Sequence, residues 1–70
     1  MILRFEHVQS TPADKWLVKH NLSTRTPIVD CYVRFEDFYI KVQPLKVRMI
    51  DLNILEITWA RPRTGRVGVI

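Results

Sequence analysis

Histidine and cysteine are the side chains of this sequence best suited to chemistry, and they are few: His7, His20 and Cys31. A nucleophilic triad or a zinc site would draw on these residue types. No serine, cysteine or carboxylate stands at a recognisable triad spacing from His20, and close ligand pairs of the C-x-x-C kind are missing. Cys31 lies in an alternating apolar run, which favours a buried, unreactive thiol. The sequence therefore predicts no catalytic residue, no metal site and no cofactor, and so no enzyme.

Phosphate loops and paired catalytic carboxylates are also missing from the pattern. The chain has two glycines, both near its end, whereas a phosphate loop is glycine-rich. Glu36 and Asp37 are adjacent, but they stand between two aromatic runs, where a solvated hairpin turn is expected. These two residues predict a turn rather than an acid–base pair.

Basic side chains are the most suggestive charged feature. The chain carries 11 Lys and Arg against 7 Asp and Glu, for a formal net charge of +4, which suits an acidic partner. The candidate interface cations are Lys46, Arg48, Arg61, Arg63 and Arg66. Phosphate contact is one interpretation of this set, docking on an acidic neighbour is another, and a plain solvated loop is the third.

Aromatic and apolar side chains supply the other candidate interface positions. Trp16 and Trp59 lie on apolar strand faces, which favours the core for both. Tyr32 and Tyr39 fall on mixed faces, where they could stack on a base or a sugar, or pack on a neighbouring subunit. The remaining candidate interface residues, on the apolar first segment, are Ile2 and Arg4.

Short alternating segments must position these side chains. Apolar residues recur at every second position, which is typical of strands, and no stretch has the period of a helix. The predicted strands cover residues 1–8, 15–20, 28–35, 38–42, 45–51, 54–59 and 66–70. Residues 9–14 and 61–65 are predicted loops. These six or seven short strands predict an all-β fold, a small antiparallel β-sandwich or barrel.

The size and composition of the chain set further bounds. Its 70 residues, 47% of them hydrophobic, predict a single β domain over residues 1–70 and exclude a disordered tail. The apolar runs are far shorter than the roughly 18 residues of a membrane span, and no signal peptide is visible. A lone cysteine cannot form an internal disulfide, so the framework is non-covalent. Oligomerisation or docking is a common way to stabilise so small a domain.

The order of several short motifs resembles a small β module of bacteriophage tail proteins. That module carries W-x-[IV]-x-H-N-L, a proline that opens the next strand, a D-x-N turn and a late glycine before a final strand. The matching residues here form what we call the scaffold motif: Trp16, Val18, His20, Asn21, Leu22, Pro27, Asp51, Asn53 and Gly65. The resemblance covers roughly residues 15–70, and the order and spacing of the pieces are more specific than any one of them.

The sequence departs from that module in two places. The turn at Glu36 and Asp37 lacks the glycine that the module tends to have there. The neutral end of the module, rich in serine and threonine, is replaced by the arginine-rich residues 61–66. The sheet scaffold therefore carries over better than any particular binding surface.

The resemblance implies a structural role in a phage virion, in the tail, the baseplate or a fibre. We expect a non-enzymatic subunit that is assembled in the host cytoplasm, docks on other virion proteins, and forms a homo-oligomer or joins a symmetric assembly. His20 and Asn21 are interpreted as ties to the adjoining loops and Leu22 as a core residue. A small basic barrel that binds nucleic acid through the tyrosines and the cations is the alternative hypothesis. No membrane partner is expected.

Overall fold

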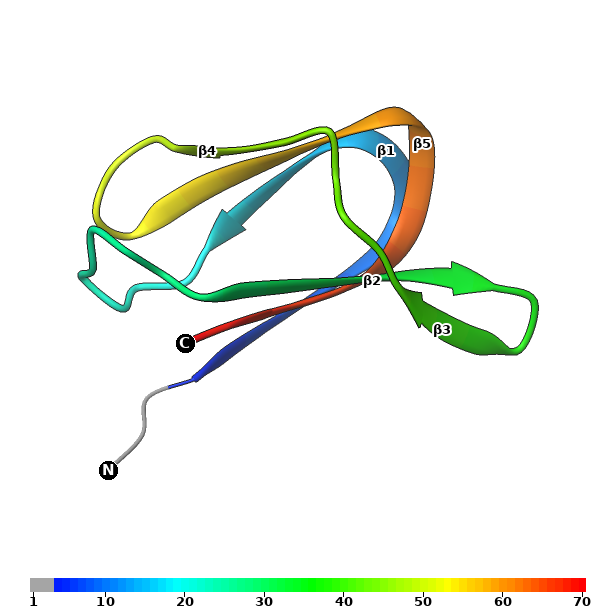
Figure 1. Ribbon diagram of the computed structural model, residues 1–70, viewed down its shortest axis with the longest axis horizontal. Helices are drawn as coiled ribbons and strands as arrows, with labels where there is room; N and C mark the ends of the chain where they lie inside the picture. Colours follow the sequence, from blue (N-terminus) through cyan, green and yellow to red (C-terminus); the bar gives the residue numbers. More distant parts are fainter. Residues whose placement is uncertain (1–3) are drawn as a thin grey trace.

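Two long antiparallel strands organise the fold, and both bend near the middle. The computed structural model describes residues 4–70. β1 (Phe5–Lys19) pairs with β5 (Ile54–Val69) in both halves, and its register shifts between Gln9 and Lys15. Figure 1 shows the two ribbons curling together at this bend, so each strand contributes to two layers.

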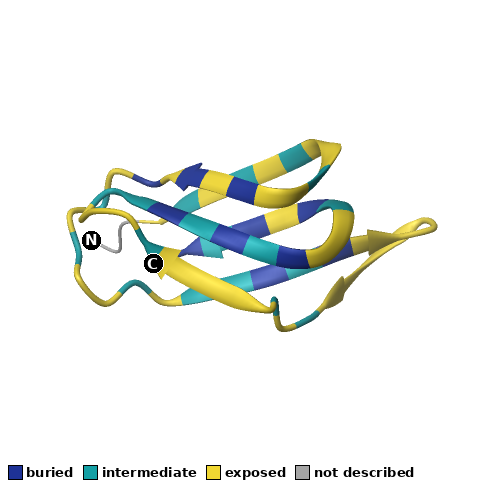
Figure 2. Ribbon diagram, turned by 90° about the horizontal axis from the view of Figure 1, so that it is seen from above, coloured by how far each residue is buried: buried dark blue, intermediate teal, exposed yellow. Residues whose placement is uncertain are grey.

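The remaining strands extend the two layers. The larger layer contains the first half of β1, the second half of β5, β2 (Val29–Phe35) and β3 (Phe38–Lys41). The smaller layer contains the second half of β1, the first half of β5 and β4 (Lys46–Met49). All pairs are antiparallel, in the order β1-β5-β2-β3 with β4 beside β5, and Figure 2 shows the resulting layers from above. The predicted all-β, antiparallel fold of the sandwich type is confirmed, although the sheet is not closed. None of the described residues lies in a helix that could cross a membrane.

The described residues form five strands rather than seven, because two pairs of predicted strands are continuous. The predicted loops at residues 9–14 and 61–65 are wrong, since both stretches belong to β1 and β5. Turn-forming residues there, including Pro12 and Pro62, mark bends rather than breaks, and extra residues at such bends are taken up as bulges. Pro12 is tolerated because β1 is an edge strand, where a missing backbone N–H breaks no ladder.

The core lies between the two layers and follows the alternation of the sequence. Inward positions on β1 change from odd numbers (Phe5, His7) to even numbers (Trp16, Val18) across the bend. The buried apolar residues are Trp16, Val18, Cys31, Val33, Leu55, Ile57, Trp59, Val67 and Val69. The rings of Trp16 and Trp59 are 5.0 Å apart and tilted by 57°, an arrangement that aromatic pairs favour. Each fully buried aliphatic side chain in such a core stabilises the fold by about 1.5–3 kcal/mol.

Candidate docking surface

The residues of the scaffold motif make structural contacts at separate places in the fold. At the end of β1, the His20 backbone N–H donates to the Asn53 carbonyl at 2.8 Å, and His20 Nδ1 accepts the Leu22 N–H at 3.1 Å. The Asn53 side chain accepts hydrogen bonds from the Ser23 N–H and hydroxyl, while Asp51 accepts the Asn53 N–H. These bonds join the loop after β1 to the turn before β5.

The bend itself is fixed by Trp16. Its indole N–H donates to the carbonyls of Ala13 and Arg63, at 2.9 and 3.2 Å, which lie on the bent parts of β1 and β5. One side chain therefore satisfies backbone acceptors on both strands where their ladder is irregular.

Pro27 and Gly65 lie near opposite ends of the pairing between β2 and β5. Pro27 directly precedes Ile28, whose backbone N–H and carbonyl both pair with Ile70. A Cβ at Gly65 would overlap the Tyr32 carbonyl oxygen and lie 3.0 Å from the Val33 Cα. β2 and β5 therefore approach so closely that only glycine fits at this position.

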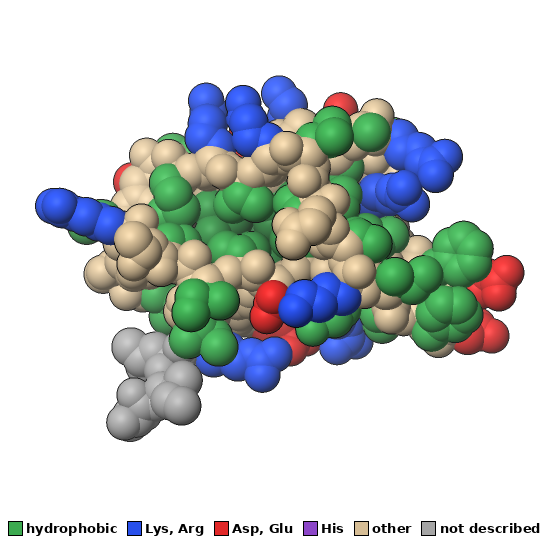
Figure 3. Space-filling model, viewed as in Figure 1, with side chains coloured by type: hydrophobic (Ala, Val, Ile, Leu, Met, Phe, Trp, Pro, Cys, Tyr) green, Lys and Arg blue, Asp and Glu red, His purple; other side chains and the backbone are tan. Residues whose placement is uncertain are grey.

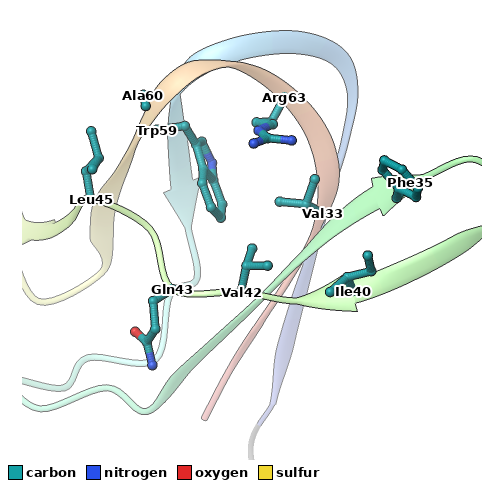
Figure 4. A pocket seen from close by; sticks show the side chains of 9 residues that line it. All are labelled: Val33, Phe35, Ile40, Val42, Gln43, Leu45, Trp59, Ala60 and Arg63. Carbon is teal, nitrogen blue, oxygen red and sulfur yellow. The ribbon is translucent and has the colours of Figure 1, made fainter.

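An apolar hollow opens between the two layers, on the side away from the free edge of β1. Its volume is about 210 Å³. Its apolar wall is formed by Val33, Phe35, Ile40, Val42, Leu45 and Trp59. The side chains of Val33, Val42 and Trp59 converge on its centre (Figure 4), and Figure 3 shows hydrophobic side chains at the bottom of this depression.

The β2–β3 hairpin carries the apolar wall out into solvent. Val33 pairs with Ile40 and Phe35 with Phe38, so all four side chains share the face that continues the core. Beyond Val33 this face is exposed. At its outer end the ring centres of Phe35 and Phe38 lie 5.8 Å apart. The outer part of the hairpin is exposed throughout (Figure 2). We call the hollow together with Phe35, Phe38, Ile40 and Leu45 the apolar face.

One hydrogen-bond donor, the Arg63 guanidinium, borders the hollow, and a second, the Trp59 indole N–H, lies buried behind it. Trp59 is 7% exposed, and its indole N–H is buried with no hydrogen-bond partner among residues 4–70. Arg63 extends over the hollow from the bent part of β5 (Figure 4) and forms no salt bridge with any described residue. An occupant of the hollow with an oxygen acceptor would pair with the Arg63 guanidinium, whereas the Trp59 N–H lies out of its reach.

The five candidate cations do not form one surface. Lys46 and Arg48 lie on the outer side of the smaller layer, as their pairing with Thr58 and Glu56 requires. Arg61 is exposed on the bend, Arg63 lines the hollow, and Arg66 lies on the outer side of the larger layer. The sequence predicts Arg61, Arg63 and Arg66 close together because a loop is expected over residues 61–65, directly before Arg66, whereas all three lie on β5.

Four candidate interface residues do meet, on the outer side of the larger layer. Arg4, Tyr32, Tyr39 and Arg66 line one shallow depression there. The Arg66 guanidinium lies 5.0 Å from the centre of the Tyr39 ring and 3.2 Å from a Glu6 carboxylate oxygen. On the same face Lys41 pairs with Asp30 at 3.1 Å. Ile2 lies outside the described residues.

Sequence reasoning missed two groupings that the pairing creates. Lys15 and Lys46 flank Thr58 from opposite sides, and Lys19 follows on the same outer face. Figure 3 shows Lys and Arg side chains along the upper side of the molecule, where Figure 1 places β4 and the first half of β5. The alternation of residues 15–19 places Lys15 and Lys19 on one face of a strand. It does not indicate that β1 and β4 both pair with β5, which brings Lys46 to the same face. The apolar face was not predicted because the apolar residues at the exposed end of the hairpin alternate in the same way as those of a core strand.

Histidine and cysteine lie in separate places. Nε2 of His7 is 2.9 Å from the Gln9 side-chain oxygen, whereas His20 and Cys31 are buried. Within residues 4–70, no three His, Cys, Asp or Glu side chains are placed to hold a metal ion. Burial, with a smaller contribution from the Asp30 carboxylate, raises the pKa of the Cys31 thiol to about 11.

Comparisons of the chain with protein-family models, with curated proteins and with solved structures found no match.

Proposed function

We propose that this chain is a non-enzymatic docking subunit that binds another polypeptide through its apolar face. The main support for this proposal is that the hollow is continuous with exposed apolar side chains. Leu45 is 70% exposed at the rim of the hollow, and Phe38 is half-exposed on the hairpin. Exposed apolar patches with a polar rim are a mark of protein–protein contact. Aromatic and arginine side chains, such as Trp59 and Arg63 here, are also the usual energetic centres of such contacts.

The size and polarity of the hollow favour a protein side chain as its occupant. Small-molecule sites usually measure about 300–1,000 Å³, so a hollow of about 210 Å³ is better suited to one or two inserted side chains. The guanidinium of Arg63 favours a partner that offers a carbonyl or carboxylate beside its apolar anchor.

The setting that we propose is a phage virion, in the tail, the baseplate or a fibre. The support for this setting is the resemblance of the scaffold motif to the tail module, together with the structural use of that motif. Trp16, His20 and Asn53 hold the bend and the loops, which leaves the apolar face available for docking on other virion proteins.

A photo-crosslinking amino acid at position 38 tests this proposal. We expect particles that contain the Phe38 variant to give a crosslink to another structural protein of the particle, mapped by mass spectrometry. The matched control is the same crosslinker at Ile50, which is also about half-exposed but lies in the turn between β4 and β5, at the other end of the molecule (Figure 1). A chain found only free in the host cytoplasm, or equal crosslinking from both positions, would contradict the proposal.

Nucleic-acid binding remains the alternative proposal, with less support from the geometry. Its cations are divided between the two layers, and Arg66 is engaged with Glu6. Binding of generic DNA or RNA that falls steeply with added salt would favour it. That binding should disappear when Arg61, Arg63 and Arg66 are replaced by alanine.

A further inference from the structure

The second half of β1 is a free sheet edge. β1 pairs only with β5 over residues 15–19, and no other described strand lies on its outer edge. An edge of this kind presents backbone N–H and C=O groups that can pair with a strand from another chain. The usable edge is short, because the register is irregular between Gln9 and Lys15 and Pro12 lacks a donor.

The outer side chains along this edge form a simple pattern. Trp16 and Val18 are fully buried, so Lys15, Leu17 and Lys19 face outward, and Leu17 is 59% exposed. Neither lysine forms a salt bridge with a described residue. Glu56 on β5 pairs with Leu17 of β1 and, on the opposite side, with Arg48 of β4. Its carboxylate lies 3.8 Å from the Arg48 guanidinium.

The two lysines disfavour a second copy of this chain at the edge. Antiparallel pairing of two such edges about Leu17 would place Lys15 of each copy opposite Lys19 of the other. Like charges directly opposite each other destabilise a strand pair, whereas opposite charges contribute roughly 0.2–1 kcal/mol. The same pattern therefore selects against self-association and in favour of an acidic strand.

We propose that residues 15–19 of β1 accept an extended segment of another protein, with the pattern acidic–x–apolar–x–acidic on its outer side. Backbone hydrogen bonds to β1 supply binding, the apolar residue packs beside Leu17, and the two carboxylates pair with Lys15 and Lys19. This edge lies apart from the apolar face, so the two proposals stand or fall separately.

Peptide titration of the intact, isotope-labelled chain tests the proposal. The probe is the peptide Thr-Glu-Thr-Leu-Thr-Glu-Thr, and the control is Thr-Lys-Thr-Leu-Thr-Lys-Thr. We expect the acidic peptide alone to shift the amide resonances of residues 15–19 and to slow their hydrogen exchange. Its affinity should fall by about tenfold or more from low to high salt, because exposed charges are screened.

Two double variants locate the binding. Lys15→Glu/Lys19→Glu should reverse the preference and bind the basic peptide, whereas Lys46→Glu/Arg48→Glu should leave binding of the acidic peptide within about twofold, since those cations lie across β5. Unchanged amides on β1, a failure of the preference to reverse, or an equal loss in the second variant would overturn the proposal. The last result would show that the acidic peptide recognises the whole basic side rather than the edge.

Discussion

At the scale of single residues, the two glycines show how differently one residue type can be constrained. Gly65 lies where β2 and β5 approach, and a Cβ there meets the backbone of Tyr32 and Val33. Gly68, on the same strand, has only the tip of the Arg4 side chain within reach, at 3.6 Å. Backbone cannot move aside as a flexible side chain can, so the late glycine of the scaffold motif is a requirement of strand packing.

We therefore predict that Gly65→Ala lowers the free energy of unfolding by about 1–3 kcal/mol, the usual cost of overpacking a tight site. Gly68→Ala should change it by less than about 0.5 kcal/mol, because its Cβ would make an ordinary contact. Urea unfolding of both variants measures the difference. Equal effects of the two substitutions would show that the close approach of β2 and β5 does not limit the structure.

Cys31 provides a second prediction at this scale, one that depends on pH. With a pKa raised from 9.0 to about 11, on the order of one thiol in a thousand is ionised at pH 8 in the folded chain. Alkylation of the folded protein should therefore be about a hundredfold slower than that of the urea-unfolded chain.

The same raised pKa predicts a loss of stability in alkali. The thiol of the unfolded chain ionises first, so the contribution of Cys31 is complete below pH 9 and declines as the pH rises toward 11. Because alkali affects other side chains as well, the relevant measurement is the difference between the wild-type chain and Cys31→Ala. Parallel pH profiles of unfolding free energy for the two chains would refute the assignment.

At the scale of the elements, alternation predicted the strands well and their ends poorly. The turn at Glu36 and Asp37 is confirmed, since β2 ends at Phe35 and β3 begins at Phe38. The breaks expected near Pro12 and Pro62 are bends, because proline, serine and threonine mark a place where pairing fails but do not say whether the chain turns back. That choice depends on the partner strand, which bends at the same place.

The β2–β3 turn predicts a stabilising substitution. Glu36 has a φ of 56°, a left-handed conformation that costs an ordinary side chain about 1–2 kcal/mol and that asparagine adopts more readily. We expect Glu36→Asn to raise the free energy of unfolding by about 0.5–1 kcal/mol, measured by thermal or urea unfolding. Asp37→Asn serves as the control, because Asp37 does not have a positive φ. A gain of the same size from Asp37→Asn would mean that net charge, not backbone strain, was responsible.

At the scale of the whole molecule, the bend determines which surfaces are open. It folds one five-stranded sheet into two layers that share β1 and β5, so the layers are joined along the bend and part at the hollow. The total surface is 5085 Å², and a standard interface of about 800 Å² per partner would cover about one sixth of it. One partner on the apolar face would thus leave the β1 edge accessible.

The candidate site could be predicted from the sequence only where its residues are close together along the chain. Residues 15–19 displayed the alternation that places Trp16 inside and Lys15 outside, and the scaffold motif pointed to the loops that it holds. The hollow brings together Val33, Leu45 and Trp59 from three separate segments, and their meeting depends on the angle of the bend. Period-two patterning carries no information on that angle.

The open apolar face predicts that the folded chain binds a hydrophobic fluorescent dye, a property usually associated with partly unfolded states. We expect Leu45→Lys to weaken dye binding by about tenfold, because it places a charge at the rim of the hollow and removes exposed apolar surface. Leu17→Lys is the matched control, since Leu17 is also more than half exposed but lies on the outer side of the smaller layer. Circular dichroism establishes that both variants are folded. If Leu17→Lys weakens dye binding as much as Leu45→Lys, the dye reports scattered surface leucines, and the hollow is not a distinct binding surface.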